Sequence, residues 1–149
     1  IYEVGTRSGA WIKIKLLHEQ EFVIGGYTEP EGTRQFFGSL IVGFYRRNEL
    51  VFVGRVGTGF STNLLRNLHS RLKDIERSSC PFVNLPLPRG SKWGQGITAS
   101  EMRFCHWVEP RLVCEVKFSE LTRDERLRQP VFVGLREDKQ AKEIVLEKA

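Results

Sequence analysis

Two short basic motifs near opposite ends of the chain carry the residue types best suited to chemistry. Trp11-Ile12-Lys13-Ile14-Lys15 places two ammonium groups on one face of an alternating segment, and Arg136-Glu137-Asp138-Lys139 places a guanidinium beside a carboxylate and an ammonium. Strand geometry separates the two lysines by about 7 Å, so both could hold phosphate oxygens of one ligand. Arginine offers phosphate a bidentate fork, which Asp138 can orient by a salt bridge. Each motif alone is more often a charged surface segment. Together they predict two sets of cations that meet the same phosphates.

A glycine-rich segment, Gly54-Arg55-Val56-Gly57-Thr58-Gly59-Phe60, is a second candidate site. It lacks the Lys-Ser/Thr of a P-loop and the GxGxxG of a dinucleotide site. We expect instead a turn whose backbone approaches a DNA strand, with Arg55, Thr58 and Gly59 as contacts. A purely structural turn between a strand and a helix explains the segment equally well. Arg66, on the helix that follows, is a further candidate DNA contact, although its basic stripe is also typical of a solvated face.

Other chemistries find no support in the sequence. The three histidines and three cysteines show neither metal-ligand spacing nor a catalytic pairing, so no metal site and no disulfide framework is expected. Cys114 alternates with apolar residues and is expected to be buried. The formal net charge of +5 favours a polyanionic partner. The odd number of cysteines without CxxC spacing makes a reducing cytoplasm the expected setting. No apolar run could span a membrane, and no signal peptide is visible. A first residue other than Met indicates an excised fragment.

The elements that must position these motifs are mainly strands. Alternating or apolar runs predict strands over 11–17, 21–27, 36–45, 50–56, 111–121 and 131–135. Ser61 or Thr62 can cap a helix whose leucines recur at helical spacing from Leu64 to Leu72 and on to Ile75. Residues 78–103 predict a long loop, 122–130 a charged turn, and the tail from residue 139 a short helix or extension. Four to five short strands with one helix after the third match an OB-fold barrel.

The motifs resemble those of a known enzyme family. Residues 5–15 look like motif V of ATP-dependent DNA ligases, and residues 21–27, 54–60 and 132–139 are similar to the C-terminal OB domain of that family, ending in motif VI. The likeness covers nearly the whole chain and is greatest to the ligase module of the bacterial non-homologous end-joining ligase D type. It implies a mainly β fold, a five-stranded Greek-key OB barrel with one main helix over 19–149. Residues 1–18 would be the tail of the nucleotidyltransferase domain.

The resemblance also implies a mechanism. Such ligases move AMP from ATP to a lysine of a KxDG motif, then to the 5′-phosphate of a nick, which the 3′-hydroxyl attacks. This chain contains no KxDG, so alone it should be inactive and bind no cofactor, while the full enzyme uses ATP and Mg²⁺. Lys13 and Lys15 would contact the adenylate phosphate. Arg136, Asp138 and Lys139 would close over ATP before the OB domain turns to the DNA minor groove.

The same resemblance implies partners and leaves alternatives. Nicked or broken duplex DNA, the upstream nucleotidyltransferase domain, Ku and end-processing domains are the expected partners, in the bacterial cytoplasm or nucleoid. A capping enzyme or RNA ligase can share the Arg-x-Asp-Lys ending, although the Trp-Ile-Lys-Ile-Lys and Gly-Thr-Gly-Phe segments favour a DNA ligase. A stand-alone OB module that binds nucleic acid or protein is the alternative that is not an enzyme.

Overall fold

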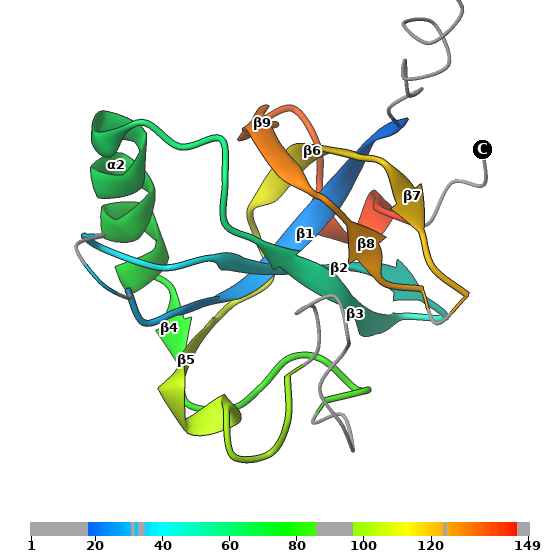
Figure 1. Cartoon of the computed structure of the whole chain (residues 1–149). Coiled ribbons are helices and arrows are strands. Elements are labelled where there is room, and N and C mark those ends of the chain that lie inside the picture. Colours follow the sequence, from blue (N-terminus) through cyan, green and yellow to red (C-terminus); the bar gives the residue numbers. More distant parts are fainter. Residues whose placement is uncertain (1–17, 31, 33–34, 86–96, 124, 146–149) are drawn as a thin grey trace, which may run out of the picture.

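A computed structural model describes residues 18–30, 32, 35–85, 97–123 and 125–145. The strand expected over 11–17, with Lys13 and Lys15, lies outside the described residues. Figure 1 shows the elements in chain order: β1 (His18–Thr28), β2 (Leu40–Arg46), β3 (Glu49–Val56), α2 (Thr62–Lys73), β4 (Glu76–Arg77), η1 (Met102–Phe104), β5 (Cys105–Val108), β6 (Val113–Phe118), β7 (Glu120–Leu121), β8 (Leu127–Arg128), β9 (Val131–Leu135) and η2 (Ala141–Glu143).

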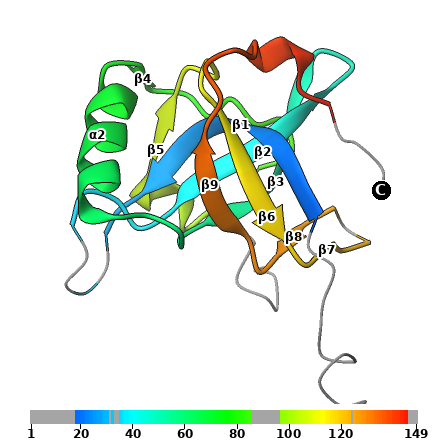
Figure 2. The same ribbon diagram turned by 90° about the horizontal axis from the view of Figure 1, so that it is seen from above.

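The strands form the expected five-stranded OB barrel, with short additions. β1 pairs antiparallel with β2 along one edge, while β6 and β5 share the other edge, β6 along 18–23 and β5 along 26–28. β2 pairs with β3, and β6 pairs with β9. β9 then returns to the end of β3, where the Phe132 N–H donates to the Thr58 carbonyl at 2.9 Å. The ring β1-β2-β3-β9-β6 is a Greek-key barrel (Figure 2), which confirms the predicted fold class.

Local sequence explains the β2–β3 hairpin, with one correction. Arg46 pairs with Glu49, and the two residues between them, Arg47 and Asn48, have φ of 52° and 67°. Positive φ at both central residues is the requirement of a two-residue type I′ turn. The first strand of this hairpin, β2, begins at Leu40, whereas the alternation predicts a start at Phe36. Phe36 has φ of 77°, which no strand residue adopts.

The helix confirms its expected start and its buried face. Ser61 is the N-cap, since its side chain accepts a hydrogen bond from the Leu64 N–H at 3.2 Å. Leu65, Leu68 and Leu72 are buried, whereas Ile75 lies beyond the end of the helix. In both views α2 lies at one end of the barrel (Figures 1 and 2). None of the helices in the described part of the chain is long and apolar enough to cross a membrane.

Short elements leave little periodic signal, so one expected strand needs correction and one strand was missed, while the expected loop is confirmed over most of its described part. The strand expected over 111–121 is divided into β6, which ends at Phe118, and the short strand β7. β7 pairs with β8, and β8 lies within the expected turn 122–130. The strand β5 was not predicted at all. The expected loop 78–103 is anchored in the core, because Phe82 and Ile97 are buried. Room for Phe82 comes from Gly25, where a Cβ would lie 2.5 Å from its ring.

Gly59 provides a test of the barrel closure. It has φ of +98°, and a Cβ there would lie 2.4 Å from the Phe132 carbonyl oxygen, which belongs to the backbone of β9. We expect Gly59→Ala to lower the free energy of unfolding by more than about 1 kcal/mol, measured by urea denaturation. Gly57→Ala is the matched control, since its Cβ would come no closer than 3.3 Å to another backbone and its φ is not positive. Equal effects at the two glycines would contradict this account.

Candidate functional site

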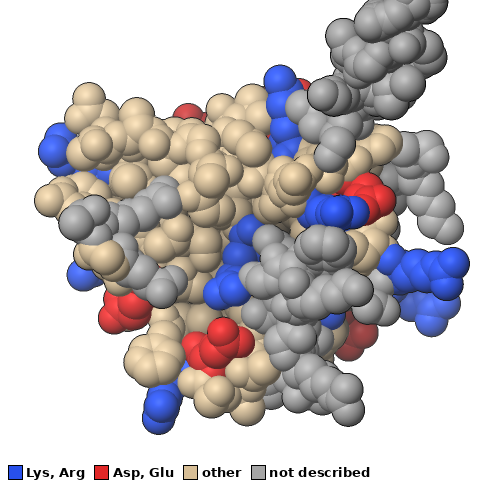
Figure 3. Space-filling view, viewed as in Figure 1, with Lys and Arg blue, Asp and Glu red and all other residues tan. Residues whose placement is uncertain are grey.

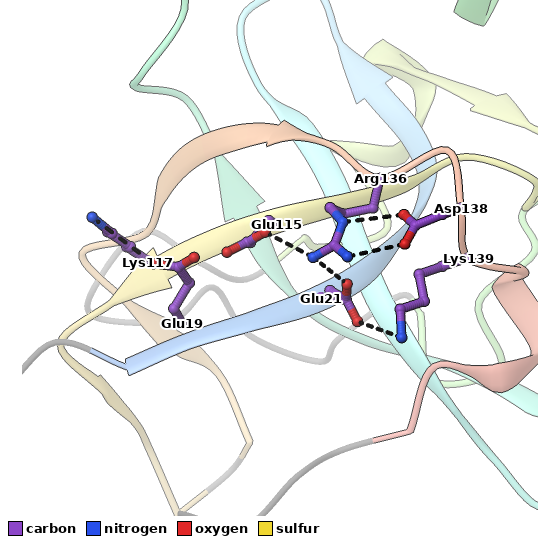
Figure 4. Close-up of polar contacts among 7 residues, drawn as sticks. All are labelled: Glu19, Glu21, Glu115, Lys117, Arg136, Asp138 and Lys139. Atoms are coloured by element: carbon purple, nitrogen blue, oxygen red, sulfur yellow. Dashed lines mark hydrogen bonds and ion pairs between the residues drawn. The ribbon is translucent and has the colours of Figure 1, made fainter.

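The arginine of the C-terminal motif is placed by the barrel itself. The Arg136 N–H donates to the Val113 carbonyl at 2.8 Å, which extends the β6–β9 ladder by one residue beyond the pairing of Leu135 with Cys114. Figure 4 shows the guanidinium lying over β1 and β6. Backbone pairing therefore fixes the Cα position of Arg136. The direction of its side chain depends on the acidic groups around it.

Two of those acidic groups face each other across the sheet. Glu21 of β1 and Glu115 of β6 are directly opposite in the antiparallel register. Like charges in such a pair destabilise a sheet. Nη1 of Arg136 lies 2.8 Å from Oε2 of Glu21 and 3.1 Å from Oε1 of Glu115, so one cation compensates both. The two glutamates are about four-fifths buried, with 20% and 21% of the side chain exposed, which strengthens the need for a counter-charge.

A third carboxylate, that of Asp138, binds the Nε and Nη2 side of the guanidinium. Nε and Nη2 of Arg136 donate to Oδ1 and Oδ2 of Asp138 at 3.2 and 3.1 Å. This is the salt bridge expected from the sequence, and its geometry is bidentate. Hydrogen bonding by Asp138 and then by Glu115 raises the pKa of Arg136, and the bond from Arg136 lowers the pKa of Asp138. Nζ of Lys139 lies 4.0 Å from Oε1 of Glu21. We call these five side chains the Arg136 cluster.

The remaining residue of the motif links it to the helix. Glu137 forms an ion pair with Arg71, in the last turn of α2, at 3.2 Å between Nη2 and Oε1. Sequence reasoning did not select Arg71, Glu21 or Glu115. Each lies far from residues 136–139 in the chain, and only the strand register and the packing of α2 bring them to the motif.

The four residues predicted to contact DNA lie elsewhere on the barrel. Thr58 and Gly59 are at the closure between β3 and β9, where the Thr58 hydroxyl also donates to the Pro130 carbonyl at 3.1 Å. Arg55 lies in β3 opposite Ile41. Arg66 is exposed on α2, with its guanidinium 5.9 Å from the centre of the Phe36 ring. These positions in β3, at the barrel closure and on α2 differ from those of the Arg136 cluster, so the predicted site residues fall into two separate groups.

The cations on one face of the molecule are dispersed. In Figure 3 the lysines and arginines on the viewed face are scattered among uncharged residues and do not form one continuous patch. Across the described ranges, no three His, Cys, Asp or Glu side chains are placed to hold a metal ion. The Arg136 cluster can orient a guanidinium fork and an ammonium, which is a means of binding an anion.

Comparison with known proteins identifies the fold and its family. Residues 33–139 match the family model described as the ATP dependent DNA ligase C terminal region. The chain is 44% identical over 147 residues to the multifunctional non-homologous end joining protein LigD of Mycolicibacterium smegmatis, covering 98% of this chain and 18% of that protein. It is 40% identical over 145 residues to LigD of Pseudomonas aeruginosa, covering 95% and 16%. A DNA ligase of Thermococcus fumicolans is 31% identical over 153 residues, covering 96% and 23%.

Solved structures agree. The ligase domain of LigD from M. tuberculosis matches with a TM-score of 0.74 at 40% identity, covering 88% of this chain and 39% of that one. A mycobacterial DNA ligase D complexed with ATP and MES matches with a TM-score of 0.70 at 38% identity, covering 87% and 38%. The chain thus spans less than a fifth of the length of the LigD relatives and about two fifths of the solved ligase chains.

The Arg136–Asp138 pair makes a testable prediction about pH. Because Arg136 lowers the pKa of Asp138 below the ordinary value of about 3.9, the pair stabilises the folded chain above pH ~4. That contribution is lost as the pH falls through the lowered pKa. In Arg136→Gln we expect the Asp138 pKa to rise towards the ordinary value, measured by carboxyl ¹³C NMR titration. Both groups are exposed, so added salt should reduce the difference. An unchanged Asp138 pKa in the variant would contradict the pairing.

Proposed function

This chain belongs to the family of C-terminal regions of ATP-dependent DNA ligases, and we propose that it is the OB-fold domain of a ligase that seals DNA breaks. In the full protein it closes over ATP while a lysine is adenylylated. It then turns another surface to nicked duplex DNA and helps to clamp it. The observation that carries this proposal is the Arg136 cluster, in which a ligase family motif sits as an oriented cation on the rim of the barrel.

The chemistry of adenylylation explains why such a cation is needed. The lysine Nζ attacks the α-phosphorus of ATP, a P–N bond forms, the bond to the bridging oxygen breaks, and pyrophosphate leaves with the negative charge. Oriented guanidinium and ammonium groups stabilise that charge and align the leaving group. A relative's solved structure holds ATP, as its description states, which supports ATP as the nucleotide. Lys13 and Lys15 would contact the adenylate phosphate from the preceding domain.

The Arg136 cluster also indicates how closure is controlled. Asp138, Glu21 and Glu115 already engage the guanidinium through all three of its nitrogens. A phosphate can bind Arg136 bidentately only by replacing part of this set. Asp138 is the carboxylate that can be replaced at least cost, because it is the most exposed of the three, while Glu21 and Glu115 keep Arg136 as their counter-charge.

The other roles follow from the family and from the sequence. We assign Arg55, Thr58, Gly59 and Arg66 to contacts with the DNA backbone in the clamped state, since phosphate contacts are made by arginines and backbone N–H groups. The adenylated lysine and the Mg²⁺ that accompanies ATP belong to the upstream nucleotidyltransferase domain. The names of the LigD relatives support a role in non-homologous end joining, with Ku and end-processing domains as partners, in the bacterial cytoplasm.

A comparison of the two reaction steps tests the role of the motif. In the full protein, Arg136→Ala should slow self-adenylylation on the order of 100-fold, and Lys139→Ala should act in the same direction. Sealing of a nick that already carries AMP should change much less. The rates can be measured as labelled AMP transferred from ATP and as single-turnover sealing.

Lys117→Ala is the matched control for that experiment. Lys117 also pairs with a glutamate across β1 and β6, Glu19 at 3.8 Å (Figure 4), but it is outside the motif. It should leave both steps unchanged. Equal losses in the two steps for Arg136→Ala would overturn the assignment to adenylylation.

The chain by itself should be unable to start the reaction. It contains no KxDG sequence, so incubation of the 149-residue chain with labelled ATP and Mg²⁺ should give no covalent AMP, even after hours. The same assay on the full protein, trapped by denaturation, is the positive control. Acid-labile AMP on the isolated chain would show that another nucleophile is present.

A further inference from the structure

A small hollow borders the motif, and neither Glu21 nor Glu115 is among its lining residues. Its volume is about 160 Å³, and it lies between the last turn of α2, the turn that joins β5 to β6, and the segment after β9. Figure 2 shows these three parts of the chain on the same side of the barrel. Residues of β6 and β9 give the hollow an apolar floor. We call it the cationic hollow, because its charged lining consists of Arg71, Arg111, Arg136 and Lys139 with Glu137 as the acidic member.

The charged lining is mainly cationic. Four cations and one carboxylate surround a space of about 160 Å³, and because Arg136 and Lys139 are already paired with Glu21, Glu115 and Asp138, the added net charge is the +1 of Arg71, Arg111 and Glu137. Glu21 and Glu115, which compensate Arg136, approach it from β1 and β6 and do not line the hollow. Converging cations over an apolar surface focus their field on the space between them and attract an anion to it.

Arg111 contributes a cation to the hollow that has no ion pair with a carboxylate among the described residues. Within the described ranges, no carboxylate oxygen lies within 4.0 Å of its guanidinium, whereas Arg71 has Glu137 at 3.2 Å. Its own backbone N–H is occupied, since it donates to the Glu109 carbonyl at 2.8 Å. A cation held at the edge of a hollow without an acidic partner has its full hydrogen-bonding capacity available for a ligand.

We propose that the cationic hollow binds a polyphosphate chain, and that Arg71 and Arg111 contact its oxygens in addition to the two cations of motif VI. The cations come from three separate segments and converge on one small space, which suits two or three linked phosphates more than the evenly spaced phosphates of a DNA strand. The inference rests on the proposed function for the identity of the ligand, which is the departing pyrophosphate of ATP. Binding of polyphosphate by the hollow can be measured independently of catalysis.

Titration of the 149-residue chain with inorganic pyrophosphate tests the site directly. At constant ionic strength, we expect saturable NMR shifts of the Nε–H signals of Arg71, Arg111 and Arg136. Arg71→Gln and Arg111→Gln should each weaken binding about tenfold, because each removes one charge-assisted contact. Arg123→Gln is the control, since Arg123 is exposed on the turn between β7 and β8, on the far side of the barrel from α2 (Figure 1).

Glu137→Gln separates binding from a merely structural role. It breaks the same ion pair as Arg71→Gln but removes a negative charge from the hollow. A phosphate site predicts tighter binding in this variant, whereas a structural role of the pair predicts weaker binding in both. Absence of shifts at Arg71 and Arg111, or affinities unaffected by their substitution, would overturn the proposal.

Two further measurements identify the source of the phosphate. A nicked DNA duplex titrated into the chain should leave the Arg71 and Arg111 signals unmoved, and shifts there with DNA but not with pyrophosphate would overturn the proposal. In the full protein, both substitutions should raise the KM for ATP in self-adenylylation. If they abolish pyrophosphate binding but leave that KM unchanged, the hollow remains a phosphate site while its use during closure over ATP is wrong.

Discussion

Two glutamates face each other across neighbouring strands of the barrel, and the placement of the C-terminal motif depends on how their charges are compensated. Glu21 and Glu115 are fixed opposite each other by the β1–β6 register, so neither can move away without breaking the ladder. The guanidinium of Arg136 lies within 2.8 and 3.1 Å of them. Because two partly buried carboxylates require a cation, they hold this arginine in place over the barrel.

The segment that carries the motif is attached to the barrel at both ends. At its start, Arg136 continues the β6–β9 ladder through the Val113 carbonyl, and at its end the Ile144 carbonyl accepts a hydrogen bond from the Tyr45 N–H at 2.7 Å. Ile144 and Ala141 are buried, and Glu137 is paired with Arg71 of α2. These contacts attach the motif to the barrel and to α2. If the domain closes over a nucleotide, the cations move with the barrel as one body, and their mutual geometry is set before the ligand arrives.

Arg136 and Lys139 stand between two regions of opposite charge. Glu21, Glu115 and Asp138 place three negative charges on one side of these two cations, whereas Arg71, Arg111 and Glu137 give a net charge of +1 on the other. A phosphate is repelled from the first region and attracted to the second. It would approach the motif from the side of Arg71 and Arg111, with the glutamates supporting Arg136 from behind. Under the proposed function, the phosphates of a nucleotide would therefore meet the motif from this one side.

Local features of the chain were predictable because they depend on residues close in sequence. The helix after Ser61, the strands β3 and β9, and the pairing of Arg136 with Asp138 two residues later all follow from spacing alone. Strands of two to four residues were missed or misplaced, because such lengths contain too little periodicity to detect. Phe82 was assigned to a loop, since nothing near it in sequence reveals the glycines against which it packs.

By itself, then, the sequence determined the OB barrel and which residues carry the charge of the motif. It also carried enough of the ligase family pattern to indicate the motif's chemistry. The tertiary structure decided which groups surround that charge. Glu21 and Glu115 meet Arg136 through strand register, and Arg71 and Arg111 reach the hollow through the packing of α2 and the β5–β6 turn. The physical reason is the range of each effect. Helical and strand periodicity depend on residues close together in the sequence. The electrostatic field at a cation depends on the charged groups that the fold brings within a few ångströms, however far apart they are along the chain.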